Sequence, residues 1–89
     1  MIIIAGYGLV DADDRDNHVA AFRDLVSRAR EADGCIHFGI TADSVDPERT
    51  NLIEVWRDGE ALGAWRKRAK APRTKKPKYM DAKQYDATG

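Results

Sequence analysis

Hydrophobic residues recur along the chain with two different periods, and these periods separate predicted strands from predicted helices. Residues 2–10 are apolar at nearly every position, which predicts a strand covered on both faces. Residues 35–42 and 51–56 alternate between apolar and other side chains, which predicts two more strands. Residues 79–85 have a weaker pattern of the same kind and are predicted to form a last strand.

Two segments between these strands have helical spacing instead. An acidic cluster at 11–16 suits the positive end of a helix dipole, and Gly34 is a typical helix stop. The apolar stripe between them consists of Val19, Phe22, Leu25, Val26 and Ala29. This pattern predicts one helix of about five turns. A second, shorter helix is predicted to begin at Asp58 and to end before Pro72, with the stripe Leu62, Trp65 and Ala69.

The order strand, helix, strand, strand, helix, strand is that of a ferredoxin-like α+β fold, β-α-β-β-α-β. Such a fold has one antiparallel sheet with both helices on one face. The second strand is expected to place Ile36, Phe38 and Ile40 on one face. The third strand is expected to place Leu52, Glu54 and Trp56 on one face, with Ile53 and Val55 on the other. Since helices can cover only one of two apolar faces, we expect a second copy of the chain to cover the other, in a homodimer.

The length of 89 residues fits a single domain over residues 1–89. A lone cysteine, Cys35, cannot form an internal disulfide or a multi-cysteine metal site, and no metal is expected. The sequence has no apolar run long enough for a membrane span and no signal-peptide pattern at its start. We therefore expect a cytoplasmic protein without a membrane partner.

The charges are distributed unevenly along the chain. Residues 1–65 carry six arginines and 13 acidic residues, whereas residues 66–89 carry nine lysines and arginines and two acidic residues. Eight of these basic residues fall within residues 66–78, a predicted loop region before the last strand. Such a run can attract a polyanion. A solvated loop is the simpler interpretation, and a nucleic-acid partner is not expected, because no RNA- or DNA-binding motif accompanies the run.

Three segments resemble a known family when they are taken in order. These are residues 5–11 in the first strand, Gly34-Cys35-Ile36-His37-Phe38 after the long helix, and Glu54-Val55-Trp56-Arg57-Asp58-Gly59-Glu60-Ala61-Leu62. Together they resemble the antibiotic biosynthesis monooxygenase (ABM) domain. The resemblance implies a dimeric α+β barrel. It also implies an activity like that of members which oxygenate aromatic polyketides without a cofactor, oxidise quinols or degrade haem.

The resemblance transfers to some positions and not to others. Trp56 matches a tryptophan that lines the substrate pocket of the polyketide oxygenases, but their asparagine four residues earlier is replaced by Leu52. Trp65 matches a tryptophan that the haem-degrading members place against the haem. Lys75 stands where those members have their haem-ligating histidine, and Gly6 stands where they have an asparagine. Haem degradation is therefore disfavoured, and the resemblance implies an oxygenase that uses O2 and no bound cofactor.

The candidate site follows from these positions and from ordinary side-chain chemistry. Oxygenation of a phenolic, quinol or polyketide-type aromatic substrate needs an aromatic pocket, a base and donors for oxyanion charge. We expect catalytic roles for Trp56, Trp65 and Glu54. We expect Gly6, Leu62, Arg66 and Tyr79 to contact the substrate.

Each of these assignments has a structural alternative. Both tryptophans can be core residues, and Glu54 can be the ion-pair partner of an arginine such as Arg66. A cavity between sheet and helices, bordered by Trp56 or Trp65, would favour an enzyme. A structure with that space fully packed would remove the enzyme interpretation and leave the alternative function, a non-catalytic module that binds a small ligand or a protein on the same dimeric fold.

Overall fold

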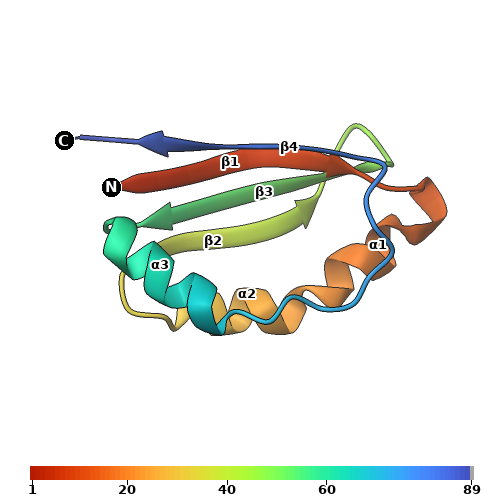
Figure 1. The fold of residues 1–89 in the computed structure, drawn as a ribbon. Helices are drawn as coiled ribbons and strands as arrows, with labels where there is room; N and C mark the ends of the chain where they lie inside the picture. The colour runs from red at the N-terminus through yellow and green to blue at the C-terminus, as the bar shows by residue number, and fades with distance from the viewer. Residues whose placement is uncertain (89) are drawn as a thin grey trace.

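The computed structural model describes residues 1–88 and contains one four-stranded antiparallel sheet with all helices on one side (Figure 1). The strands lie in the order β2-β3-β1-β4. Their bounds are β1 Ile2–Leu9, β2 Cys35–Ala42, β3 Arg49–Trp56 and β4 Tyr79–Asp86. The helices are α1 Ala12–Ala21, α2 Arg23–Arg30 and α3 Gly59–Arg68. The fold is thus the α+β, ferredoxin-like arrangement that the sequence predicts, with β3 and β1 at its centre.

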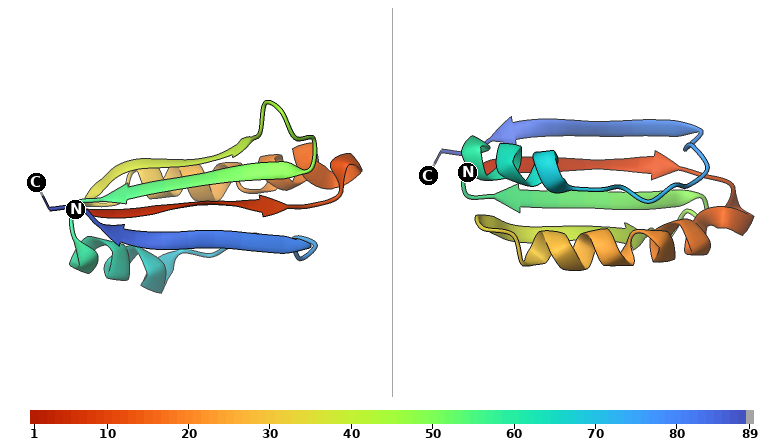
Figure 2. Two further views of the ribbon diagram at one scale, coloured as in Figure 1. Left: turned by 90° about the horizontal axis from the view of Figure 1, so that it is seen from above. Right: turned by 60° about the horizontal axis from the view of Figure 1, so that its bottom comes forward.

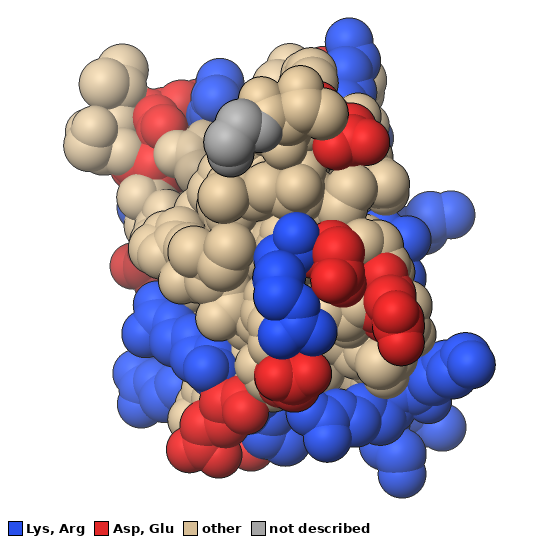
Figure 3. All heavy atoms as spheres, turned by 90° about the vertical axis from the view of Figure 1, so that its left-hand side faces the viewer, with Lys and Arg blue, Asp and Glu red and all other residues tan. Residues whose placement is uncertain are grey.

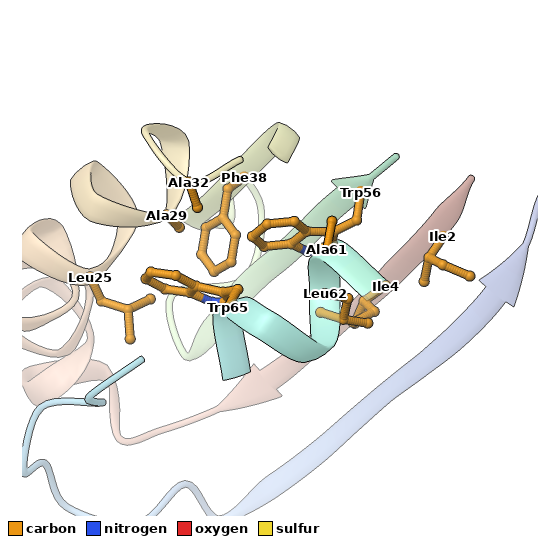
Figure 4. Packing of buried hydrophobic residues seen from close by; sticks show 10 residues of the cluster. All are labelled: Ile2, Ile4, Leu25, Ala29, Ala32, Phe38, Trp56, Ala61, Leu62 and Trp65. Carbon is orange, nitrogen blue, oxygen red and sulfur yellow. The ribbon is translucent and has the colours of Figure 1, made fainter. Parts of the chain in front are cut away.

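The register of the sheet fixes which side chains face the helices. Ile2 lies opposite Trp56 and Ile4 opposite Glu54, so the even-numbered residues of β1 and β3 share the helix-side face. Phe38 lies opposite Glu54 and joins this face from β2. The buried core lies here, between sheet and helices, and Figure 4 shows its members. They are Ile2, Ile4, Leu25, Ala29, Ala32, Phe38, Trp56, Ala61, Leu62 and Trp65.

A β-bulge at the start of β2 changes one predicted face. Cys35 lies opposite Trp56 and His37 lies opposite Val55, so Ile36 is an extra residue without a partner. The prediction that Ile36 shares the face of Phe38 is therefore wrong. The side chain of Ile36 is 55% exposed, whereas Phe38 is buried in the core.

The predicted long helix is interrupted at Phe22, so that α1 and α2 are separate segments. The Phe22 N–H bonds the Val19 carbonyl at 3.1 Å, which closes a tighter turn than an α-helical one. The segments differ in what they bury: α1 buries no side chain, whereas α2 buries Leu25 and Ala29. The break places Phe22 against the edge of the core while α1 continues beyond it.

The second predicted helix begins where the sequence places it and ends earlier. The Asp58 carboxylate accepts a hydrogen bond from the Ala61 N–H at 2.8 Å, as expected of an N-terminal cap. Helix α3 ends at Arg68, and residues 69–78 then run as coil along the helix side of the sheet to β4 (Figures 1 and 2). Pro72 disfavours a helical conformation of Ala71 before it, consistent with a helix that stops short.

The other face of the sheet has no covering element in the described chain. Figure 1 shows every helix below the sheet, as predicted. The uncovered face carries Ile3, Ala5, Ile53 and Val55 at its centre, side by side in the register. None of the helices within residues 1–88 is long and apolar enough to cross a lipid bilayer.

Candidate functional site

Three aromatic rings from three elements meet on the helix side of the sheet (Figure 4). Trp56, at the end of β3, is completely buried, and Trp65 of α3 is 5% exposed. Their rings are stacked with centroids 6.1 Å apart. Phe38 of β2 meets both rings edge-on, at 6.4 and 6.3 Å. Aromatic pairs prefer such offset and edge-on geometries, so this cluster stabilises the fold whatever else it does.

Glu54 is the one carboxylate on the helix-side face of β3, and Trp56 binds it directly. The indole Nε1–H of Trp56 donates a hydrogen bond to Glu54 Oε1 at 3.0 Å. Burial raises the pKa of the Glu54 carboxyl group, while this hydrogen bond and the charge of Arg66 act in the opposite direction. A half-buried carboxylate with a raised pKa can accept a proton from a weak acid. The Trp56 N–H, in contrast, is already used by Glu54.

The structure brings some of the other expected residues to this cluster and separates one from it. Leu62 is buried in the same core as the tryptophans, and Arg66 lies close enough to act electrostatically on Glu54. Gly6 lies opposite Leu52 on the helix-side face. A methyl group at Gly6 would overlap the Asp81 carbonyl of β4 and lie 2.5 Å from Ala82 Cα, so this position requires glycine. Tyr79 pairs with Leu9 on the opposite face and is not brought to the cluster.

The space around the tryptophans is occupied by side chains. Trp56 has no exposed surface, and the rings of Trp65 and Phe38 pack against it at the place where a cavity was expected. Trp65 instead borders a groove of about 260 Å³ on the outer surface, with Arg57 and Arg68 among its lining residues. The guanidinium groups of Arg28 and Arg68 each lie 5.8 Å from the centroid of the Trp65 ring. The exposed edge of Trp65 is therefore flanked by cations.

The metal-ligating side chains of the described residues do not form a metal site. Within the described chain, no three His, Cys, Asp or Glu side chains gather as metal ligands do. Cys35 lies beside Trp56 in the register, but burial and the Glu54 charge raise the pKa of its thiol. A thiol with a raised pKa is a poor nucleophile and a poor metal ligand at neutral pH.

The structure also contains a polar network on the uncovered face, which the sequence analysis did not identify. The Arg49 guanidinium lies 4.1 Å from the Tyr7 ring centroid, and Arg49 also donates a 2.7 Å hydrogen bond to Asn51. Asn51 in turn donates to Asp43, whose carboxylate accepts two more hydrogen bonds from backbone N–H groups in its turn. These bonds lower the pKa of Asp43 to about 2. The polar residues Arg49 and Asn51 at alternate positions of β3 are the only sequence signal for this network.

Comparison with known proteins places the chain in a family. A family model described as antibiotic biosynthesis monooxygenase matches residues 1–76. No curated protein sequence matches the chain.

Solved structures share the fold at low sequence identity. One of Nitrosomonas europaea, provisionally assigned as an antibiotic biosynthesis monooxygenase, aligns with a TM-score of 0.76 at 18% identity over 98% of both chains. A conserved protein of Methanosarcina mazei aligns with a TM-score of 0.76 at 14% identity, over 98% of this chain and 92% of that one. A further antibiotic biosynthesis monooxygenase gives 0.73 at 19% identity over the whole of both chains. The family model spans both the Glu54–Trp56 pair and Trp65, and the chain belongs to the antibiotic biosynthesis monooxygenase family.

Proposed function

We propose that this protein is a cofactor-independent monooxygenase that acts on a phenolic, quinol or polyketide-type aromatic substrate. The observation that supports this most is Glu54, a half-buried carboxylate whose pKa burial raises, on the side of the sheet where the aromatic cluster lies. Family membership supports an activity of the monooxygenase type. Glu54 has the role of general base in this proposal, and Arg66 that of a nearby cation for the substrate anion.

The proposed reaction needs no electron donor other than the substrate. For a substrate such as an anthrone, whose CH2 group is acidic because the carbanion is also a phenolate, Glu54 removes a proton from that CH2 group. The resulting carbanion transfers electrons to O2 and binds it as a peroxide. The peroxide then loses water, so that a CH2 group of the substrate becomes a C=O group. One oxygen atom of O2 enters the product and the other leaves as water, and the four electrons that reduce O2 come from the oxidised carbon. The protein contributes the base, a dry site and charge stabilisation.

A homodimer is part of the same proposal. The uncovered sheet face carries Ile3, Ile53 and Val55 at its centre, and the exposed Tyr85 lies opposite Ile3 on β4. An apolar sheet face of this kind is stabilised when a second sheet packs on it. A second copy of the chain offers the same face and would bury both.

One observation favours the alternative function, a binding module without turnover. Trp56 is completely buried and donates its N–H to Glu54, so no surface of this residue is free to contact a substrate. A protein of this kind would bind an aromatic ligand at the groove beside Trp65 and would not consume O2.

Oxygen uptake tests the enzyme directly. Purified protein is incubated with anthrone-like phenols and with quinols while dissolved O2 is recorded. We expect uptake above buffer with at least one substrate, and a rate that rises with pH as Glu54 loses its proton, since only the carboxylate form is a base. Glu54→Gln is expected to lower the rate about 100-fold or more, the usual contribution of a general base. Glu60→Gln, which removes an exposed carboxylate from the first turn of α3, is the control and should leave the rate unchanged.

The two functions give different patterns in this experiment. If uptake stays at the buffer level for every substrate while the same compounds quench tryptophan fluorescence, the protein binds without catalysis. If Glu54→Gln retains the full rate of uptake, Glu54 is not the base and the proposed mechanism is wrong.

A further inference from the structure

The coil between α3 and β4 spans the helix layer as a strap, which we define as residues 69–78. Figure 2 shows it crossing the sheet on the helix side, between α3 and the end of α1, where neither helix covers the central strands. Half-buried residues recur along it: Ala69, Pro72, Thr74 and Pro77. The strap therefore completes the cover of the helix-side face, on which Glu54 lies.

The strap is fixed at its ends and not in the middle. At its start, the Ala69 N–H bonds the Trp65 carbonyl at 2.8 Å, and the Arg28 guanidinium bonds the Lys70 carbonyl at 3.1 Å. At its end, the Lys78 N–H bonds the Leu9 carbonyl at 2.8 Å. Residues 71–74 make no hydrogen bond to any residue of the described chain. A segment with so few backbone hydrogen bonds opens at low cost in free energy.

An ion-pair network, which we call the latch, holds the second half of the strap. Lys78 Nζ lies 2.8 Å from Glu48 and 3.3 Å from Asp11. Lys75 Nζ lies 3.3 Å from Asp11 and 3.8 Å from Asp14. The latch thus joins the end of the strap to the first turn of α1 and to the turn before β3. It uses two cations of the basic run and three carboxylates of the acidic first part of the chain.

Ion pairs of exposed side chains contribute to this connection, in addition to the partial burial of Thr74 and Pro77 and the backbone hydrogen bond of Lys78 to Leu9. Beside the latch, a groove of about 290 Å³ separates the strap at Arg73 and Thr74 from α1 at Asn17, His18 and Ala21. Both lysines of the latch are largely exposed, with side chains 76% and 47% accessible. Exposed ion pairs are individually weak and are screened by salt, so such a connection can break and re-form without unfolding the domain.

Most other cations of the basic run point into solvent. Arg73 and Lys76, for example, are exposed. Figure 3 views the molecule from the left-hand side of Figure 1 and shows Lys and Arg side chains of the whole chain gathered over the lower part of that side. The strap thus combines repulsion among its own cations with the attraction of Lys75 and Lys78 to acidic side chains across the latch. Both terms depend on ionic strength.

We propose that the latch holds the strap closed across the helix-side face of the sheet, and that release of the latch opens the route by which a small molecule reaches Glu54. The first half of this inference concerns the fold alone. The second half rests on the proposed function, because it takes Glu54 as the group that meets the substrate.

Limited proteolysis with trypsin measures the opening. Trypsin needs an extended, freely accessible segment and can cut after Arg73 only when the strap leaves the surface. Asp11→Asn and Asp14→Asn together remove two of the latch carboxylates and keep every trypsin site of the strap. Asp13→Asn combined with Asp16→Asn removes the same number of carboxylates from the same helix, at exposed positions outside the latch, and is the matched control, called the Asp13→Asn control below.

We expect the double variant to be cut after Arg73 about five- to tenfold faster than the Asp13→Asn control at low salt, since three exposed ion pairs are lost. Added sodium chloride should raise the rate for the control and the wild type, because it screens the intact latch, and should change the double variant little. Equal rates for the double variant and the Asp13→Asn control at low salt would overturn the latch. The latch would also be overturned if cleavage after Arg73 were no faster than cleavage inside α2, because equal rates at both sites indicate global unfolding.

Substrate turnover separates this inference from the proposed function. If the protein consumes O2, the double variant should show a lower salt dependence of kcat/KM than the Asp13→Asn control. If the double variant is cut faster but its kcat/KM has the same salt dependence as that of the control, the latch is supported and its role in access to Glu54 is refuted. Absence of turnover would refute the proposed function and leave the proteolysis result to decide the latch.

Discussion

Replacing Trp56 by phenylalanine tests whether its hydrogen bond to an ionised Glu54 stabilises the fold. Phenylalanine keeps an aromatic ring in the cluster but removes the indole N–H that donates to Glu54 Oε1 at 3.0 Å. Trp65→Phe is the matched control, because it is the same change in the stacked neighbouring ring. The Trp65 indole nitrogen makes no hydrogen bond to another described residue.

The expected magnitude has two parts. The smaller ring leaves about 40 Å³ empty, which costs about 1 kcal/mol if the surroundings do not collapse, in either variant. Only Trp56→Phe also loses a hydrogen bond, worth about 2 kcal/mol to a charged acceptor and about 1 kcal/mol to a neutral one. We therefore expect Trp56→Phe to lower the free energy of unfolding by about 3 kcal/mol when Glu54 is ionised and by about 2 kcal/mol when it is protonated. Trp65→Phe should lower the free energy of unfolding by about 1 kcal/mol whether Glu54 is ionised or protonated.

The sign of the pH dependence follows from the pKa of Glu54. Burial raises this pKa in the folded state, so the group contributes stability below its unfolded pKa and loses that contribution as pH rises through the folded value. Without the Trp56 N–H, the carboxylate form is less favourable and the folded pKa rises further. The difference in free energy of unfolding between the wild type and Trp56→Phe should consequently grow as the pH increases from about 4 to about 7.5.

Urea unfolding at a fixed protein concentration measures these differences, with the fluorescence of the remaining tryptophan as the signal. A destabilisation by Trp56→Phe that is the same at both pH values would refute the reasoning, since the hydrogen bond would then not depend on the charge of Glu54. An equally pH-dependent loss in Trp65→Phe would refute it too, because that variant leaves the bond intact.

Three further predictions are tested by urea unfolding or by sedimentation velocity. Gly34→Ala should lower the free energy of unfolding by about 2 kcal/mol or more, and with it the urea midpoint, because Gly34 has φ +82° and a methyl group there would overlap Ala61 Cβ. An unchanged midpoint would contradict this conformation of the turn. Asp43 has its pKa lowered to about 2, so it contributes stability above its ordinary pKa that is lost as pH falls toward 2; Asp43→Asn should lack that loss, and a wild-type acid slope in the variant would count against the network. Ile53→Lys places a charge on the uncovered sheet face and should convert a dimer into a monomer in sedimentation velocity; a wild-type protein that sediments as a monomer at micromolar concentration would exclude the dimer from the start.

Features with a local cause could be predicted from the sequence. The strand and helix order follows from periodicity alone, and Asp58 was identifiable as a helix cap because a cap depends on the next three residues only. Gly34 likewise ends a helix because it adopts φ +82°, which other residues avoid. The shared helix-side face of Glu54 and Trp56 follows from the strand period of two.

Features that depend on the register of distant segments could not be predicted in this way. The bulge at Ile36 exists because Cys35 and His37 both pair with consecutive residues of β3, and no local pattern sets that pairing. The break at Phe22 has no proline or glycine to mark it in the sequence, and Phe22 packs against the core there. The latch joins Lys75 to Asp11, 64 residues apart, and the opposite charges of the two parts of the chain are its only trace in the sequence.

The spacing of Glu54 and Trp56 explains how a carboxylate and an aromatic ring come to lie side by side in this fold. On a strand, residues two apart are neighbours on one face, so the indole N–H reaches the carboxylate without any loop to position it. Val55, between them, points to the uncovered face and can pack against a partner without disturbing either. The bond occupies Oε1 and leaves Oε2 of the carboxylate to accept a proton. When it does so, the charge that strengthens the Trp56 hydrogen bond disappears, so the pair holds Glu54 in place most firmly in the form that can act as a base.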